Sequence, residues 1–554
     1  MKKIFLQRKW LLIGIIVLAF ILRFYRLGSY PAFNADEASI GYDAYSLLQT
    51  GKDQHGNSWP VSFQSFNDYK PGLYVYIVMP FVKILGLNEW AVRLPNALVG
   101  VVSVYIVYLL VGKLAGRRFS LLAAFFLAIS PWHIHFSRGG WEANVATFLI
   151  AVGVLFFVSF VNSQRNVWYL VGSGVALVAS MYCYQATRVV GPLVGIGLIL
   201  IYRREVISSK RLLIIVGAVG LVLLIPLVVN VTKGSALARV AGVGLFADPG
   251  PRSRIEEQRG EHGDVGSLMG KVLHNKIVNY GLAFVYNWGK HFHGEFLFLS
   301  GDEVQRNKVP ETGEMYIFEV LFLVVGGWLV VGRINNKGSQ VFLMWIIGGP
   351  VASALTFQSP SALRAENLVI PLVSISSIGA MTVIDFLKKI KLIHIRNMSF
   401  VVISLMIMWG VGRYLQMYYV HMAKEYPYSS QYGVKELVNY IRNVQDKYQK
   451  IVITDRYDQP YILFLFYGAA SGMENMEPGY FQGNHSLTGR DGFGFSTVNH
   501  FDKYYFTSIK YDQARVENPN SLLVGTSEEI PKEANIVQDI YGTNNYLYFR
   551  AVAN

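Results

Sequence analysis

The sequence is dominated by long apolar runs that are separated by short polar segments. Many of these runs approach the ~20 residues that a helix needs to cross a bilayer. The chain has 554 residues, of which 52% are hydrophobic and 16% are charged, whereas soluble domains carry roughly 25% charged residues. We therefore expect an all-α polytopic membrane protein with about 11 transmembrane helices, and up to about 13 if the hydropathy windows miss a pair.

The order of polar and basic segments predicts how the chain crosses the membrane. Lys and Arg gather in alternate short loops, which places those loops and the N-terminus in the cytoplasm of a multi-pass plasma-membrane protein. The segment Gly72–Leu87 is short and contains Pro80, so we expect an interfacial helix there. The expected spans are Trp10–Leu27, Ala91–Val111, Phe119–Trp132, Ala143–Val161, Val167–Tyr184, Val189–Ile201, Leu212–Asn230, Met315–Gly332, Val341–Phe357, Ala365–Leu387 and Met398–Met417.

The hydropathy pattern divides the chain into a membrane domain, residues 1–420, and a hydrophilic tail, residues 421–554. Two outer loops, residues 28–71 and 231–314, interrupt the membrane domain. The tail has helical periodicity at 433–446 and strand-like alternation at 450–455 and 545–552, which predicts a small extracytoplasmic α/β domain.

Charge and cysteine content exclude several kinds of partner. The net charge of +14 could indicate nucleic-acid binding, but the basic residues follow the membrane topology, so we expect contacts with membrane lipids and no nucleic acid. Cys183 is the single cysteine. The chain therefore has no intrachain disulfide and no site made of several thiolates.

The first outer loop carries two adjacent acids, Asp36 and Glu37, shortly after the first span. Carboxylates at a membrane edge are costly to desolvate and usually bind or react in a wet cavity. One of them could act as a general base toward an acceptor hydroxyl. The alternative is an acidic N-terminal turn of a helix, because ADEASIGYDAYSLL resembles a helix start.

The same loop ends in Asp68-Tyr69-Lys70-Pro71, which we expect to open the interfacial helix with the proline in its first turn. Lys70 could contact a lipid phosphate at headgroup depth, with Asp68 in a supporting role. The alternative for Lys70 is an ordinary lysine that extends its ammonium group to the membrane surface.

Three charged residues mark other outer ends of the membrane segments. Arg138 could bind phosphate through two hydrogen bonds, and Glu142 could orient it or contact the acceptor. A simple Arg–Glu pair four residues apart is the alternative. Arg364 precedes Glu366 at another helix mouth, where it could bind phosphate or pair locally.

Two histidine pairs, His133/His135 and His291/His293, could suggest a metal. Residues two apart face the same way on a strand but not at a helix end, and no carboxylate cluster of ligand spacing accompanies them. A divalent metal is therefore not favoured, and we expect no cofactor.

Several motifs in a fixed order resemble the bacterial branch of the protein mannosyltransferase family, glycosyltransferase family 39 of the GT-C class, which is related to the lipid A aminoarabinose transferases. The resemblance covers roughly residues 23–371. The motifs are ADE, DYKPGLY, EWAVRLPNALVG, GRRFSLLAAFFLAISPWHIHFSRGGWEAN, FLFLSGDEVQRNKVPETGEMY and SPSALRAENLVIP.

This resemblance implies an inverting hexosyl or pentosyl transferase that uses a polyprenyl-phosphate-linked sugar at the outer membrane face, without a metal. It implies that Asp36 is the catalytic carboxylate with Glu37 beside it, and that Lys70 contacts the lipid phosphate. Arg364 matches the arginine of the family's late Leu-Arg motif. Glu142 matches the acid of the second outer loop. Two positions differ from relatives: Tyr69 precedes the lysine, and Glu142 replaces an aspartate of several relatives.

The leading hypothesis is therefore sugar transfer to a protein, lipid or glycan acceptor, with Lys70, Arg138 and Arg364 offsetting the charge of the departing phosphate. The alternative hypothesis is a flippase or exporter of lipid-linked sugars, which would place ionisable residues and broken helices at mid-membrane depth. The sequence identifies neither the sugar nor the acceptor.

Overall fold

The structure is a computed structural model that describes residues 2–66, 68–163, 166–232, 242–263, 267–482, 484–488 and 497–554. Contacts divide the chain into two compact units that interleave in sequence. Unit 1 comprises Met1–Arg23, Leu98–Ser137 and Glu142–Met417, and unit 2 comprises Phe24–Ala97, Arg138–Trp141 and Tyr418–Asn554.

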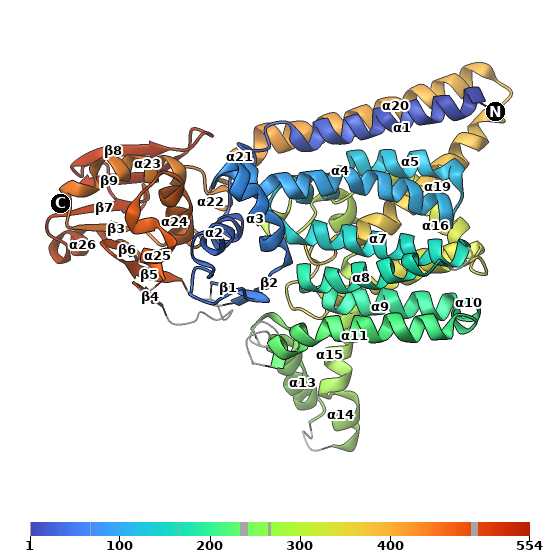
Figure 1. Cartoon of the computed structure of the whole chain (residues 1–554), viewed down its shortest axis with the longest axis horizontal. Helices are drawn as coiled ribbons and strands as arrows, with labels where there is room; N and C mark the ends of the chain where they lie inside the picture. The colour runs from blue at the N-terminus through green and yellow to red at the C-terminus, as the bar shows by residue number, and fades with distance from the viewer. Residues whose placement is uncertain are drawn as a thin grey trace. The chain divides into compact units, whose positions relative to one another are not determined.

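Unit 1 is helical. In Figure 1 helices α7, α8, α9 and α11 run across the view roughly parallel to one another, and α8 contacts each of the other three. The helices that contribute to this unit are α1 (Lys2–Phe24), α4 (Glu89–Leu114), α5 (Arg117–Ile129), α6 (Pro131–Arg138), α7 (Glu142–Asn162), α8 (Val167–Cys183), α9 (Thr187–Ile201), α10 (Arg203–Ile207), α11 (Lys210–Thr232), α13 (Gly250–Glu261), α14 (Leu268–Leu273), α15 (Lys276–Lys290), α16 (Glu319–Gly332), α17 (Lys337–Gly348), α18 (Val351–Ala354), α19 (Val369–Lys388) and α20 (Ile393–Gln416).

Five described helices are long and apolar enough to cross a membrane, or six if the bent pair α5–α6 counts as one span. They are Glu89–Leu114, Glu142–Asn162, Arg211–Asn230, Glu366–Lys388 and Ile393–Glu425. Five further apolar helices have 10–17 residues. The expected number of about 11 spans therefore stays a prediction.

The expected span Phe119–Trp132 is broken in the structure. Helices α5 and α6 meet at an angle of 55°, because Pro131 has no backbone N–H with which to continue α5. The break leaves carbonyl groups of α5 without helical partners. Arg23 of α1 satisfies two of them, donating to the oxygens of Ala128 at 3.0 Å and Leu127 at 3.1 Å.

Helices α16 and α19 approach each other through two glycines. A Cβ atom at Gly326 would lie 2.0 Å from the carbonyl oxygen of Ile375, and one at Gly379 would lie 1.8 Å from that of Phe322. Small residues at a helix–helix interface allow this close backbone approach in membranes, where van der Waals packing drives association.

Unit 2 contains a seven-stranded mixed sheet in the order β4-β5-β6-β3-β7-β9-β8. Strand β3 runs parallel to β6 and β7, and the other pairs are antiparallel. The strands are β3 (Lys450–Ile453), β4 (His485–Leu487), β5 (Val498–Phe501), β6 (Tyr504–Phe506), β7 (Ser521–Gly525), β8 (Ile536–Tyr541) and β9 (Leu547–Ala553). Strand β7, which lies between β3 and β9, is buried throughout and reads SLLVG, as a strand covered on both faces should.

The remaining elements of unit 2 are helices and one hairpin. They are α2 (Ala35–Thr50), β1 (Ser62–Ser65), β2 (Asp68–Pro71), α3 (Leu73–Leu85), α21 (Met422–Glu425), α22 (Pro427–Ser430), α23 (Val434–Val444), α24 (Pro460–Ala470), α25 (Pro478–Phe481) and α26 (Tyr511–Glu517). The expectation that residues 68–71 form the first turn of the interfacial helix is wrong. These residues pair with β1 as a strand, and α3 begins only after Gly72.

The C-terminal segment of unit 2 supports α2. The backbone N–H of Ala35 donates to Gln431 Oε1 at 2.9 Å, and the hydroxyl of Tyr42 donates to the carbonyl oxygen of Met476 at 2.8 Å. Gly41 faces the ring of Phe466 so closely that a Cβ atom there would lie 2.6 Å from it. The helix that carries Asp36 and Glu37 is therefore held in place by residues about 400 positions later in the chain.

We expect Gly326→Ala to destabilise the protein by about 1–3 kcal/mol, because the added methyl group meets a backbone carbonyl that cannot move aside easily. Thermal unfolding of the purified protein in detergent measures the effect. Gly327→Ala is the matched control, since nothing lies within 4 Å of a Cβ atom at that position. Equal unfolding temperatures for the two variants would contradict the close contact of α16 with α19.

Candidate active site

The first turn of α2 begins with a capping box. Asn34 Oδ1 accepts a hydrogen bond from the N–H of Glu37 at 3.0 Å, and Glu37 Oε2 accepts one from the N–H of Asn34 at 3.2 Å. This reciprocal arrangement satisfies N–H groups that have no partner within the helix. The prediction that ADEASIGYDAYSLL begins a helix is confirmed, and Glu37 belongs to the cap of that helix.

Glu37 is also the partner of a buried arginine. Arg93 donates to Glu37 Oε1 through Nε and to Oε2 through Nη2, each at 2.7 Å. The N–H of Gly140 donates to Oε1 at 2.7 Å. Glu37 and Arg93 are 1% and 0% exposed. Through these contacts Glu37 holds the start of α2 to Arg93 and Gly140.

Arg93 joins the segment that precedes α2 to helix α4. Besides Glu37, it donates to the carbonyl oxygens of Leu27, Pro31 and Ala32 at 2.9, 2.9 and 3.0 Å. A guanidinium group has five N–H donors in a rigid plane. The entry to α2 is therefore shaped by one side chain that binds three backbone carbonyls and a carboxylate.

Asp36, the neighbour of Glu37, forms an ion pair with Lys70 of β2. Their side chains are 19% and 14% exposed, so the pair is largely but not fully buried. The ammonium group of Lys70 also lies 5.0 Å from the centre of the Phe66 ring. The structure thus brings together the two residues that the sequence assigned to base and phosphate contact, through the β1–β2 hairpin.

A second carboxylate of α2, Asp43, lies about two helical turns after Asp36. Asp43 is 1% exposed and accepts hydrogen bonds from the N–H of Gln54 at 3.0 Å and from Gln54 Nε2 at 3.2 Å. Burial raises the pKa of Asp43 well above its usual range, the charge of Asp53 raises it further, and the bonds from Gln54 and the charge of Lys70 oppose the rise. Asp43 connects α2 with the loop that precedes the hairpin.

Asp68 and Arg138 are both buried in unit 2. Asp68 stands opposite Ser65 in the hairpin. Arg138 donates through Nη2 to the carbonyl oxygens of Tyr25 and Tyr30 at 2.7 and 3.0 Å. The central carbon of its guanidinium group lies 5.4 Å from the centre of the Tyr418 ring. These contacts give Arg138 a structural task in the segment before α2.

Glu142 and Arg364 belong to unit 1. Glu142 begins α7, whereas Arg138 ends α6. Arg364 donates through Nη1 to the carbonyl oxygen of Gln358 at 2.8 Å and to Thr356 Oγ1 at 3.0 Å. Glu366 is not its hydrogen-bond partner, because neither carboxylate oxygen of Glu366 has a partner among the described residues.

Two acids of the loop before α16 were not assigned roles from the sequence. Asp302 is 1% exposed and accepts from the N–H groups of Ala362 at 2.7 Å and Val304 at 2.8 Å. Glu314 is 5% exposed. Burial raises the pKa of both, and the charge of Asp302 further raises the pKa of Glu314. Asp302 therefore ties this loop to the segment that carries Arg364.

The histidines are engaged in hydrogen bonds. Because guanidinium only donates, His133 Nδ1 accepts from Arg23 at 2.6 Å. His135 Nε2 donates to the carbonyl oxygen of Arg306 at 3.0 Å. His291 binds the carbonyl oxygen of Asn287 and Ser353 Oγ, each at 2.9 Å. Within the described ranges, no three His, Cys, Asp or Glu side chains gather as a metal site would require.

Sequence reasoning assigned no role to Arg93, Asp43 or Asp302. Arg93 stands in EWAVRLPN and Asp302 in LSGDEVQ, both within motifs that carried the family resemblance. A charged residue inside an otherwise apolar helix is a usable signal, because it must find a buried partner. Asp43 carries no comparable signal, since a helix of mixed polarity offers no reason to bury it.

Comparison with known proteins places this geometry in context. The family model PMT_2, described as dolichyl-phosphate-mannose-protein mannosyltransferase, matches residues 69–229. "Putative mannosyltransferase YycA" of Bacillus subtilis is 29% identical over 121 residues, which cover 22% of this chain and 18% of that protein. An uncharacterized protein of Aquifex aeolicus is 28% identical over 199 residues, 36% of this chain and 38% of that protein. The matches thus span less than two-fifths of either relative.

Solved structures match over a greater length. ArnT from Cupriavidus metallidurans bound to undecaprenyl phosphate aligns with a TM-score of 0.51 and 12% identity, over 97% of both chains. The chain has the GT-C glycosyltransferase fold. The oligosaccharyltransferase AglB from Archaeoglobus fulgidus, in complex with an inhibitory peptide and a dolichol-phosphate, has a TM-score of 0.50 and 13% identity over 83% of this chain and 64% of that one.

These findings confirm the resemblance to GT-C glycosyltransferases that the motifs indicated. They also identify the chain as a multi-pass membrane protein. At 12–13% identity the solved structures establish the GT-C fold alone.

We expect Arg93→Met to lower the free energy of unfolding by about 3–5 kcal/mol, because Glu37 would stay buried without its cation. Lys435→Met is the matched control. Lys435 pairs with Glu89 at 2.6 Å but is 52% exposed, and exposed pairs contribute at most about 1 kcal/mol. Thermal or denaturant unfolding in detergent compares the two, and equal losses would contradict the central role of Arg93.

The raised pKa of Glu314 predicts a pH dependence of stability. A carboxyl group whose pKa is higher in the folded than in the unfolded state stabilises the fold fully below its unfolded pKa of about 4.3, and this contribution is lost as the pH rises. We therefore expect Glu314→Gln to reduce the fall in unfolding temperature between pH 4.5 and 8. Glu303 lies in the same loop but is exposed, so Glu303→Gln should leave the dependence of the unfolding temperature on pH as in the wild type. The same pH dependence in both variants would refute the raised pKa of Glu314.

Proposed function

We propose that the protein transfers a hexosyl or pentosyl group from a polyprenyl-phosphate-linked donor to a hydroxyl group of a protein, lipid or glycan acceptor. The observation that carries this proposal is the Asp36–Lys70 ion pair at the first turn of α2, in a chain with the GT-C fold. Two structural neighbours support the donor class, since one is bound to undecaprenyl phosphate and the other to a dolichol-phosphate.

In the proposed reaction, the donor phosphate binds the ammonium group of Lys70 and so competes with Asp36 for it. The released carboxylate of Asp36 then takes the proton of the acceptor hydroxyl. The acceptor oxygen attacks the anomeric carbon as the bond from that carbon to the phosphate oxygen breaks, and the polyprenyl phosphate leaves with the electron pair. A single displacement inverts the configuration, and Lys70 offsets the charge that develops on the leaving group.

The position of Asp36 in the first turn of α2 favours this chemistry. A helix N-terminus carries partial positive charge, so it stabilises an anionic side chain and also attracts a phosphate. The 16-residue helix is held at this end by the capping box and by Arg93. We assign Glu37 and Arg138 to positioning this segment, while a phosphate contact for Arg364 stays a prediction from the sequence.

We further propose that this site and the C-terminal sheet face the outside of the plasma membrane, with the N-terminus in the cytoplasm, as the distribution of basic residues predicts. The C-terminal segment then acts as a support for α2, through Gln431 and Met476. No metal has a role in the proposed step.

We expect Asp36→Asn to lower the rate of sugar transfer by about 10²–10⁴-fold, as for loss of a general base. The same variant should bind undecaprenyl phosphate as tightly as the wild type or more tightly, because Lys70 loses its competing partner. Lys70→Met should instead weaken this binding by about 10-fold or more, the effect of one lost charge-assisted hydrogen bond.

The assay uses the full chain in proteoliposomes with undecaprenyl-phosphate-linked sugars, and mass spectrometry detects the transferred sugar. Asp446→Asn is the matched control, because that carboxylate is 96% exposed. Wild-type turnover by Asp36→Asn would refute the proposal. Movement of donor across the bilayer without any transfer product would favour the exporter. Glycan and glycolipid profiles of a strain that lacks the protein then identify sugar and acceptor.

A further inference from the structure

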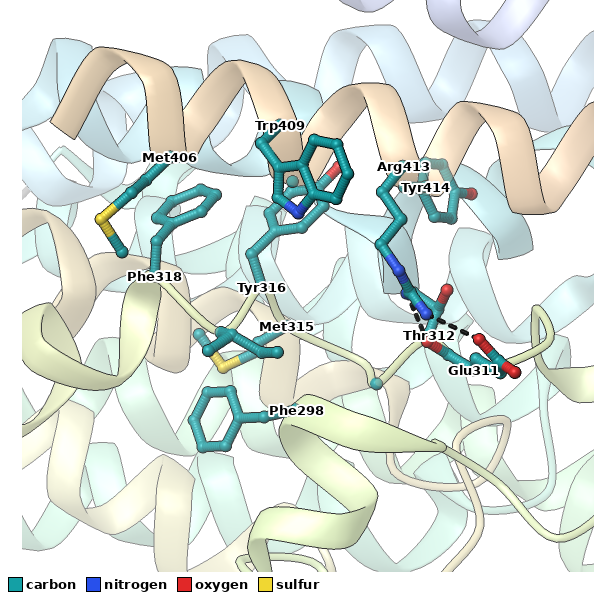
Figure 2. Close-up of a pocket in the computed structure, with 13 residues that line it drawn as sticks. Phe298, Glu311, Thr312, Met315, Tyr316, Phe318, Met406, Trp409, Arg413 and Tyr414 are labelled. Carbon is teal, nitrogen blue, oxygen red and sulfur yellow. Dashed lines mark hydrogen bonds and ion pairs between the residues drawn. The ribbon is translucent and has the colours of Figure 1, made fainter. Parts of the chain in front are cut away.

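Unit 1 contains a cavity of about 220 Å³ between α20 and the loop that leads into α16. This cavity is called the groove from here on. Figure 2 shows its side chains projecting from both elements toward one another. The floor is apolar and buried: Met315, Tyr316, Phe318 and Tyr414 are each less than 9% exposed. Pockets that enclose a drug-sized ligand have volumes of ~300–1,000 Å³. The groove is smaller, so it holds only part of a larger molecule.

The wall of this groove is one face of α20. Met406, Trp409 and Arg413 are three and four residues apart, so they lie along the same side of the helix, and Figure 2 shows all three on the groove side. Trp409 is 73% exposed and Met406 is 46% exposed. The helix qualifies as a membrane span by length and composition, so this apolar face is one that lipid chains can reach.

One end of the groove carries a pair of opposite charges. Arg413, in the last turn of α20, donates to the carbonyl oxygen of Glu311 at 2.6 Å and to Glu311 Oε2 at 2.8 Å. The side chains of Arg413 and Glu311 are 37% and 72% exposed. A tryptophan and an arginine at the end of a membrane helix are typical of headgroup depth.

We propose that this groove, lined by Phe298, Glu311, Phe318, Met406, Trp409 and Arg413, binds a phospholipid with a phosphoethanolamine headgroup. The phosphate would accept hydrogen bonds from Arg413, whose planar group suits a phosphate. The primary ammonium group would bind the carboxylate of Glu311. An acyl chain would follow the apolar floor past Trp409 and Met406 toward Phe318.

The charge pair distinguishes this lipid from others in the membrane. A headgroup with a negative charge only, such as phosphatidylglycerol or a polyprenyl phosphate, would meet Arg413 but would also lie beside the carboxylate of Glu311, and like charges repel. A headgroup that carries both charges matches both side chains. The site therefore selects the zwitterionic lipid through charge complementarity, separately from the proposed transfer at Asp36.

Native mass spectrometry of the full chain in detergent, with added phosphatidylethanolamine or phosphatidylglycerol, tests this proposal. We expect the wild type to retain phosphatidylethanolamine about 10-fold better than phosphatidylglycerol. Arg413→Gln should lower this retention about 10-fold, the effect of one charge-assisted hydrogen bond. Arg396→Gln is the matched control, since it removes the same charge from the other end of α20.

Glu311→Gln provides the second arm and stays informative even if Arg413→Gln fails to fold. With the carboxylate removed, the preference between the two lipids should fall to about 1 or reverse, because Arg413 then favours the anionic headgroup. Equal retention of both lipids by the wild type would overturn the proposal. So would equal effects of Arg413→Gln and Arg396→Gln, or displacement of phosphatidylethanolamine by equimolar undecaprenyl phosphate.

Discussion

The bidentate contact between Arg93 and Glu37 is the interaction on which the candidate active site depends. Burying two charges is expensive, and their attraction compensates only when the remaining donors and acceptors are satisfied. Here Arg93 also binds three backbone carbonyls, and Glu37 also accepts from Gly140 and the helix cap. One pair thus fixes the segment after α1, the start of α2 and the Gly139–Gly140 turn relative to α4.

That fixed frame gives two adjacent acids different tasks. Successive residues of an α-helix point about 100° apart, so Glu37 faces Arg93 while Asp36 faces Lys70. The Glu37–Arg93 contact is fully buried, whereas the Asp36–Lys70 contact is partly exposed. An ion pair that is largely desolvated yet reachable is suited to exchange partners when an anionic ligand arrives, whereas the sealed pair holds the geometry against which that exchange takes place.

Sequence reasoning recovered the membrane class and singled out Asp36 and Lys70, which form an ion pair in the structure, since the apolar runs and the motif resemblance are strong signals. It misjudged residues 68–71, because Pro71 suits a helix start and only the pairing with β1 makes them a strand. It missed Arg93, whose role depends on a residue 56 positions earlier. In the hydrophilic tail, strands β3 and β9 and helix α23 lie where the sequence alternation and helical periodicity predicted them. Apolar length alone is ambiguous, as α24 shows, because this helix is buried in unit 2 beside α2.

The capping box has a consequence for reading related sequences. Because the third helical residue must return to the cap while the second projects outward, the letters D and E at positions 36 and 37 are not interchangeable in order. A relative with Glu-Asp here would offer a longer acid to the lysine and a carboxylate too short to span cap and guanidinium together. Alignments that score the two acids as equivalent would hide this difference, and a search for homologues with the same chemistry should weigh the order of the dipeptide itself.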